Sequence, residues 1–156
     1  MQINTYNPKA FYQLIRTIFF ALIVGLLLFL IVVLYLHGKN LTFIFDTSNP
    51  FTFVMFLSLI VIPIGFFYSS KVFKSYRPNS TLKDKLPIYQ HGLIMRMAFC
   101  EAVGLFSIVC ILMLANLYFL IFVAIALGAM ITNYPSPEKI GEVMELTPTE
   151  IDSLRN

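Results

Sequence analysis

Apolar residues run along this chain in long segments, with little of the alternation typical of soluble proteins. Three segments contain no Asp, Glu, Lys or Arg over 17 to 20 residues: 17–36, 51–70 and 117–133. Each is close to the roughly 20 residues that a helix needs to cross a hydrocarbon layer about 30 Å thick. The pattern therefore predicts membrane-spanning helices.

A fourth segment, 95–114, is also largely apolar but contains Arg96 near its start and one carboxylate, Glu101. With this segment the sequence predicts an all-α protein, an integral membrane four-helix bundle over 1–134. The spans are expected at about 15–37, 51–70, 92–114 and 117–134. A short helical cytoplasmic tail is expected over 135–156.

The composition supports a membrane class. The chain of 156 residues is 58% hydrophobic and only 12% charged, whereas soluble domains are about 25% charged. Its net charge of +3 is explained by basic residues gathered in one connection between spans. We therefore expect the lipid bilayer as a partner and no nucleic acid.

Local breaks and small residues add detail to the spans. Pro63 is expected to kink the second span, because proline removes a backbone donor, and Gly65 eases the bend. Ser58, Ile62, Gly65 and Ser69 share one side of that helix, which indicates either a polar seam or helix-to-helix hydrogen bonds. The pairs Ala21/Gly25 and Ala124/Gly128 indicate packing faces. Pro78 and Pro87 argue against one long helix over 71–90.

The connection 71–90 is basic and predicts the topology. Its cations are expected to orient the chain and to contact anionic lipid headgroups at the cytoplasmic face: Lys71, Lys74, Arg77, Lys83 and Lys85. Lys39 alone falls on the other side of a four-span chain. Both termini are therefore expected in the cytoplasm, in a multi-pass protein of the inner (cytoplasmic) membrane.

The tail has clear helix signals. Ser136 and Pro137 are typical of an N-cap and a first helical residue, and Thr147 to Glu150 form a capping-box pattern. The tail is acidic, so it is expected to dock on the basic connection or on a partner, or to remain a solvated acidic surface.

Catalytic signatures are absent from the sequence. There is no Cys-x-x-Cys, His-Glu-x-x-His or Gly-rich phosphate loop, which indicates a protein that is not an enzyme and has no cofactor or metal site. Cys100 and Cys110 lie ten residues apart, or about 15 Å along one helix, which is too far for a disulfide.

Glu101 is the centre of a candidate intramembrane polar site with Arg16 and Arg96. Such a carboxylate can bind a proton or cation, or it can be paired, since an unpaired charge in the bilayer is costly. We hypothesise an ion pair with Arg16, at the cytoplasmic end of the first span. Arg96 points about 140° away around the helix and is expected to extend to the interface.

Residues 95–150 resemble small uncharacterised four-span inner-membrane proteins of bacteria. The resemblance rests on the third-span pattern Met97, Ala98, Glu101, Ala102, Leu105 and Phe106, and on a tail with Pro-Glu-Lys followed by Leu-Thr-Pro-x-Glu. It implies the class and no activity. The carboxylate followed by Gly104 and an apolar run also resembles the proteolipid subunits of rotary ATPases. Those proteins, however, carry the carboxylate near mid-membrane in the second helix of a hairpin.

Two functions remain open at this level. The first is a small non-enzymatic accessory or scaffold component that packs with itself, as a homo-oligomer, or with another membrane complex. The alternative is a proton- or ion-handling channel or carrier that uses Glu101.

Overall fold

The computed structural model describes residues 7–46, 48–75 and 80–155, and most of them are helical. The helices are α1 (Pro8–His37), α2 (Pro50–Ser58), α3 (Val61–Phe73), α4 (Leu82–Leu114), α5 (Leu120–Ile131), α6 (Pro137–Met144) and α7 (Pro148–Arg155). Two short 3₁₀ turns are η1 (Gly38–Asn40) and η2 (Leu117–Phe119). The helical fold class expected from the sequence is therefore present.

Three helical segments in the described part of the chain are long and apolar enough to cross a membrane. They are Pro8–Asn40, Pro50–Phe73 and Leu82–Leu114, and they correspond to the first three predicted spans. The fourth prediction, 117–134, coincides with a shorter apolar helix, Leu117–Ile131. Its start is set by Asn116, whose Oδ1 accepts a hydrogen bond from Tyr118 N at 3.0 Å and caps the turn before α5. Its end is at Ile131.

The second segment is broken, as Pro63 predicts. Helix α2 ends at Ser58 and α3 begins at Val61. Proline has no N–H to donate to the carbonyl four residues earlier, and its ring collides with that carbonyl, which here belongs to Leu59. The break therefore lies at Leu59 and Ile60, one turn before the proline itself.

Helix α3 ends at Phe73 and α4 begins at Leu82, so no single helix covers 71–90, as Pro78 and Pro87 predicted. Pro87 itself, however, lies within α4. The helix begins at Leu82 and contains Pro87 in its second turn. Thr81 and Asp84 form a capping box, with a 3.3 Å bond from Thr81 N to the Asp84 carboxylate. Proline so near a helix start costs one internal hydrogen bond, and the capping box satisfies donors in the preceding turn.

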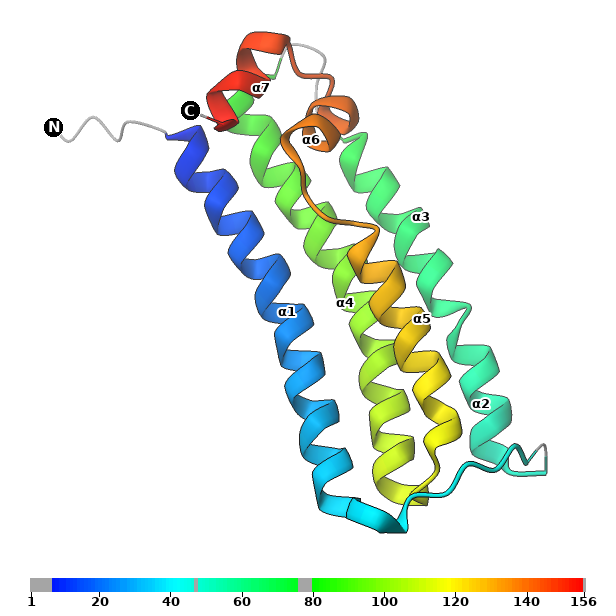
Figure 1. Cartoon of the computed structure of the whole chain (residues 1–156). Helices are drawn as coiled ribbons and strands as arrows, with labels where there is room; N and C mark the ends of the chain where they lie inside the picture. Colours follow the sequence, from blue (N-terminus) through cyan, green and yellow to red (C-terminus); the bar gives the residue numbers. More distant parts are fainter. Residues whose placement is uncertain (1–6, 47, 76–79, 156) are drawn as a thin grey trace, which may run out of the picture.

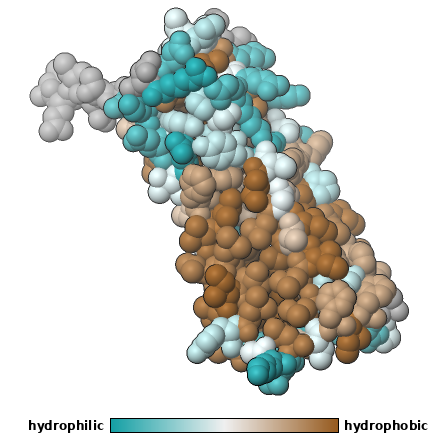
Figure 2. Space-filling view, in the orientation of Figure 1, coloured by the Kyte–Doolittle hydropathy of each residue, from teal (hydrophilic) through white to brown (hydrophobic). Residues whose placement is uncertain are grey.

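Helix α4 is the centre of the bundle. Helices α1, α3 and α5 all pack against it (Figure 1). In its most apolar window 44% of the residues are buried, compared with 17% in each of the other two long segments. Figure 2 shows the result, an apolar band in the middle of the molecule between more polar ends.

The ends of the bundle are held by different means. At one end the loop after α1 pairs with the α4–α5 turn, through Thr42 N to Ala115 O at 2.8 Å and Leu117 N to Thr42 O at 2.7 Å. At the other end α6 packs on α4 and α7 packs on α1. Ile140, Met144 and Leu154 of this tail are buried, so the tail docks within the chain mainly through apolar contacts.

Candidate functional site: a polar cluster around Arg96

Arg96 joins three helices near the tail end of the bundle. Its Nε donates to Ser69 Oγ at 2.8 Å, and one terminal nitrogen donates to Asn133 Oδ1 at 2.9 Å. The other terminal nitrogen lies 3.4 Å from Ser70 Oγ. Ser69 and Ser70 belong to α3, and Asn133 follows α5. We call these four residues the Arg96 cluster.

Aromatic rings complete the surroundings of the guanidinium. Its Cζ lies 4.5 Å from the ring centroid of Phe66 and 5.0 Å from that of Phe73. A guanidinium over a ring face is stabilised by the negative potential of the ring. Phe73 in turn stacks on Tyr89, with centroids 5.4 Å apart. The rings therefore fix the position of the Arg96 guanidinium, and the hydrogen bonds fix its orientation.

Gly92 makes this arrangement possible. The ring of Phe73 lies so close to Gly92 that a Cβ on that residue would collide with it. Any larger residue one turn before Arg96 would therefore displace the ring from under the guanidinium. Gly92 and Arg96 lie four residues apart on α4. This spacing positions both the Phe73 ring and the guanidinium that contacts it.

Neutral groups supply the hydrogen bonds of the Arg96 cluster. Ser69 and Asn133 are almost fully buried, at 0% and 3% exposure, and no Asp or Glu among the described residues pairs with Arg96. A second cation, Lys139, donates to Thr132 O at 2.6 Å. Burial, together with the nearby Arg96 guanidinium, holds the pKa of Lys139 below its ordinary value. Within the Arg96 cluster the guanidinium donates, and the oxygens of Ser69, Ser70 and Asn133 accept.

The structure gives Arg96 partners that the sequence did not predict. Its side chain lies at the tail end of the apolar band, where it binds α3 and the end of α5. The sequence contained one signal for this contact, because Ser69 belongs to the polar side proposed for the second span. Ser70 and Asn133 were not anticipated, since nothing in a local pattern shows that they meet Arg96.

Arg16 and Glu101 do not form the hypothesised ion pair. The ion pairs among the described residues are Arg155 with Glu138 and with Asp152. The Arg16 guanidinium instead lies 5.8 Å from the ring centroid of Tyr12 and 6.0 Å from that of Tyr134. Glu101 is half-buried on α4. Arg16 lies too near the tail end to reach it.

The basic residues of the connection have different surroundings. Lys71, Lys74 and Lys83 are exposed, and the Lys71 amine lies 4.4 Å from the centroid of the Phe67 ring. Lys85 is buried and donates to the backbone carbonyl of Glu145 at 3.2 Å. Arg77 lies outside the described residues. Lys85 thus binds the tail, whereas the three described lysines of the connection that are exposed stay available to lipid headgroups.

The remaining candidate chemistry is limited. Cys100 and Cys110 are free and buried, as the spacing predicted. Among residues 7–46, 48–75 and 80–155, no group of three or more His, Cys, Asp or Glu is placed to hold a metal ion. The structure therefore brings together one notable polar constellation, the Arg96 cluster, and leaves Glu101 apart from it.

Comparison of the chain with protein-family models, with curated proteins and with solved structures finds no match.

Proposed function

We propose that this chain is a small, non-enzymatic integral membrane protein that acts as a scaffold or accessory component, packing with itself or with another membrane complex. The observation that carries this proposal is the unequal burial of the long helices. Large apolar side chains of α1, α2 and α3 are exposed, among them Leu28, Ile31, Phe53 and Phe67. Such faces suit lipid or the helices of another membrane protein.

A four-span arrangement is part of the proposal. The 18 residues from Met97 to Leu114 cover about 27 Å at 1.5 Å per residue, which is close to the hydrocarbon thickness. Helix α5 returns alongside α4, and Asn133 reaches Arg96 at its end (Figure 1). This pairing supports α5 as a fourth crossing despite its length.

The proposed orientation places both termini in the cytoplasm of a bacterial cell, with the chain in the inner membrane. The start of α1, the end of α3, the start of α4 and the helices α6 and α7 lie at one end of the bundle (Figure 1). Lys71, Lys74, Lys83 and Lys85 belong to that end, and Lys39 to the opposite one. The positive-inside rule therefore supports this orientation, and anionic lipids suit the exposed lysines.

The scaffold is preferred over ion handling because Glu101 has no polar path among the described residues. The nearest polar residues on α4 are engaged elsewhere, Arg96 with the Arg96 cluster and Ser107 with the Val103 carbonyl at 2.7 Å. An ion-binding carboxylate needs such a chain of polar groups or a water-filled cavity.

The test is the assembly state of the chain in its own membrane. Membranes are cross-linked and then solubilised in mild detergent, and the mass of the chain's particles is measured by light scattering. A mass above that of the monomer is expected, together with no proton flux in vesicles of the purified protein. A solitary monomer, or a flux that Glu101→Gln removes, contradicts the proposal.

A further inference from the structure

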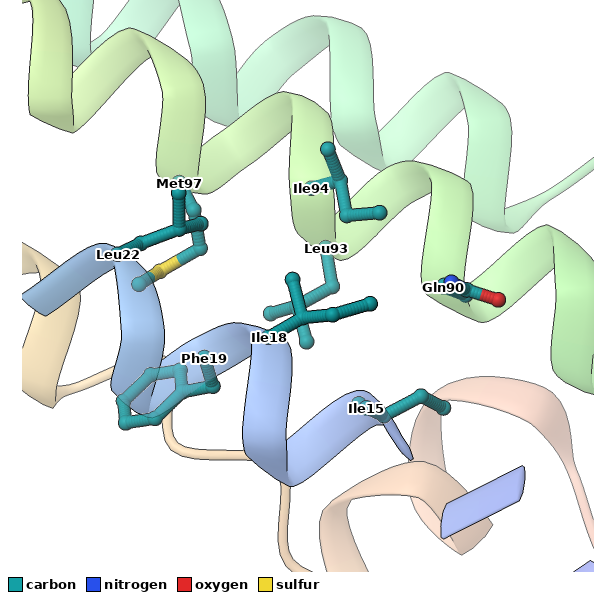
Figure 3. A pocket seen from close by; sticks show the side chains of 8 residues that line it. All are labelled: Ile15, Ile18, Phe19, Leu22, Gln90, Leu93, Ile94 and Met97. Carbon is teal, nitrogen blue, oxygen red and sulfur yellow. The ribbon is translucent and has the colours of Figure 1, made fainter. Parts of the chain in front are cut away.

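Glu101 lies beside α1 within the apolar band. One turn before it, Met97 lines a seam between α4 and α1 together with Leu22 (Figure 3). Nearly one turn after it, Gly104 faces Leu26, since a Cβ there would lie 2.8 Å from that side chain. Glu101 therefore lies at the depth of residues 22 to 26, about 7 Å deeper than Arg96 by the helical rise.

The Glu101 carboxylate has no partner among residues 7–46, 48–75 and 80–155. Neither a hydrogen bond nor an ion pair joins Glu101 to any described residue. The neighbouring segments 17–36 and 51–70 contain no Lys or Arg. A second copy at the same depth would bring the same apolar segments and another carboxylate. A different protein can supply the basic group that these segments lack.

Small residues leave space beside the carboxylate. Ile18 and Ile94 face each other across the seam (Figure 3). Helical spacing continues their faces through Ala21 and Gly25 on α1 and through Ala98 and Glu101 on α4. Ala21, Gly25 and Ala98 are exposed. We call the six residues along this face the Glu101 seam: Ile18, Ala21, Gly25, Ile94, Ala98 and Glu101.

Glycine 25 differs from the glycines that pack within the chain. A Cβ at Gly65, Gly92 or Gly104 would meet a side chain of a neighbouring helix, whereas a Cβ at Gly25 meets nothing within 4 Å. A glycine costs helix stability and is usually balanced by close packing. In membranes small residues let two helices approach closely, so the space over Gly25 is open to another helix.

We propose that the Glu101 seam docks a transmembrane helix of another protein, and that this helix places a lysine or arginine against the Glu101 carboxylate. The inference rests on the proposed accessory function and specifies the partner for it. The occupant follows from charge complementarity, because a carboxylate in hydrocarbon is stabilised by a basic group that it can hydrogen bond. The small residues bring the two backbones close enough for that contact.

A defined probe helix tests the docking directly. The full-length chain, labelled with a fluorescent donor, is reconstituted in phosphatidylcholine vesicles with an acceptor-labelled Leu/Ala transmembrane peptide. One peptide carries a single lysine about 7 Å inside its apolar core, and the control peptide carries leucine there. Energy transfer is expected to report association that is about fivefold to thirtyfold stronger for the lysine peptide.

Variants of the Glu101 seam distinguish the contribution of charge to peptide binding from the contribution of shape. Glu101→Gln is expected to remove the preference for the lysine peptide, and Gly25→Leu to weaken binding of both peptides. Gly128→Leu is the matched control, since Gly128 on α5 also has nothing within 4 Å of a Cβ; it is expected to bind as the wild type does. Circular dichroism verifies that each variant is folded. Equal binding of the two peptides, or a lysine preference that survives Glu101→Gln, overturns the proposal.

The same variants distinguish this inference from the proposed function. If Glu101→Gln releases the chain from the assemblies found in its own membrane, both proposals are supported. If those assemblies persist in Glu101→Gln, the Glu101 seam is not the docking surface and the accessory function stands. If the wild-type chain forms no assembly, the accessory function itself fails.

Discussion

At the scale of single residues, two of the charged residues on α4, Arg96 and Glu101, have opposite surroundings. Arg96 has hydrogen bonds and ring contacts from two neighbouring helices, whereas Glu101 has no partner among the described residues. A charge in low dielectric is tolerated only when its donors or acceptors are satisfied. Arg96 is therefore satisfied within the chain, and the proposed docking helix would supply a partner for Glu101.

Replacing Arg96 is expected to loosen the junction of α3, α4 and α5. Arg96→Ala leaves Ser69 and Asn133 buried without their donor, which is expected to lower the free energy of unfolding by about 2–3 kcal/mol. Arg96→Lys should recover only part of this, because an ammonium lacks the planar fork that reaches both groups. Reversible unfolding in mixed detergent micelles measures the difference.

Lys83→Ala is the control for Arg96, since Lys83 is an exposed cation on the same helix. Its free energy of unfolding is expected to match that of the wild type within about 0.5 kcal/mol. An Arg96→Ala variant as stable as Lys83→Ala would show that the Arg96 cluster does not hold the three helices together.

Two glycines give a matched pair of substitutions. A Cβ at Gly65 would collide with the Cβ of Phe99, which is fixed to the α4 backbone, whereas Gly25 is open. Gly65→Ala is expected to lower the free energy of unfolding by about 1–3 kcal/mol through overpacking. Gly25→Ala is expected to leave it unchanged or raise it by up to about 1 kcal/mol. The detergent unfolding assay compares them, and equal effects would contradict close α3–α4 packing at Gly65.

At the scale of elements, the tail is built as part of the bundle. Helix α6 is capped by Ser136, whose Oγ accepts from Lys139 N at 3.2 Å, and α7 is capped by Thr147 and Glu150. Lys85 fixes the link between them by donating to the Glu145 carbonyl. These contacts satisfy groups at helix ends that would otherwise lack partners, so the two short helices depend on docking for their stability.

Acid is expected to loosen the tail. Hydrogen bonds from the Thr147 backbone and hydroxyl hold the pKa of Glu150 below its ordinary value, and the Arg155 hydrogen bond does the same for the pKa of Glu138. Carboxylates with a lowered pKa in the folded state stabilise it at neutral pH, and this contribution is lost as the pH falls through the lowered pKa. Hydrogen exchange at Leu154, corrected for the intrinsic rate, should show falling protection between about pH 6 and pH 3.

The control for this pH effect is Glu150→Gln. The amide keeps the shape of the cap but cannot titrate, so protection at neutral pH should be lower and its dependence on pH weaker than in the wild type. The same pH dependence in both proteins would show that the Glu150 cap does not control docking of the tail.

At the scale of the whole molecule, polarity is arranged along the bundle axis. The apolar band lies between the Arg96 cluster at one end and the Thr42–Asn116 pairing at the other. Backbone groups cannot remain unpaired in hydrocarbon, which explains why irregular chain is confined to these ends apart from the break at Leu59 and Ile60. The two polar ends therefore mark the expected membrane surfaces.

Single cysteines test the proposed topology. Asp46→Cys and Ser153→Cys lie at opposite ends of the bundle, and both positions are in polar segments. In intact cells a membrane-impermeant thiol reagent is expected to label Asp46→Cys and to reach Ser153→Cys only after the membrane is permeabilised. Cys100 and Cys110 are buried and should stay unlabelled. Labelling of both positions from outside would contradict a chain whose tail faces the cytoplasm.

The amino-acid sequence alone determined the elements of this protein. Apolar runs predicted the three long helices, two of these runs being free of charged residues and the third containing Glu101, while the charge-free run 117–133 forms a shorter helix. Pro63 predicted the break before α3, and the cap residues predicted α6 and α7. These signals are local, because hydropathy, proline geometry and capping act within a few residues. The boundary of α4 was the exception, since the Thr81–Asp84 capping box outweighed the expected effect of Pro87.

The tertiary structure alone decided which polar groups meet. Ser69, Arg96 and Asn133 come from three separate segments, and their contact depends on how each helix is rotated about its axis and at what depth it lies. The same rotation directs Arg16 to Tyr12 and Tyr134 and leaves Glu101 at the seam. A hydrophobic pattern sets the length of a membrane helix, but the packing of its neighbours sets its rotation.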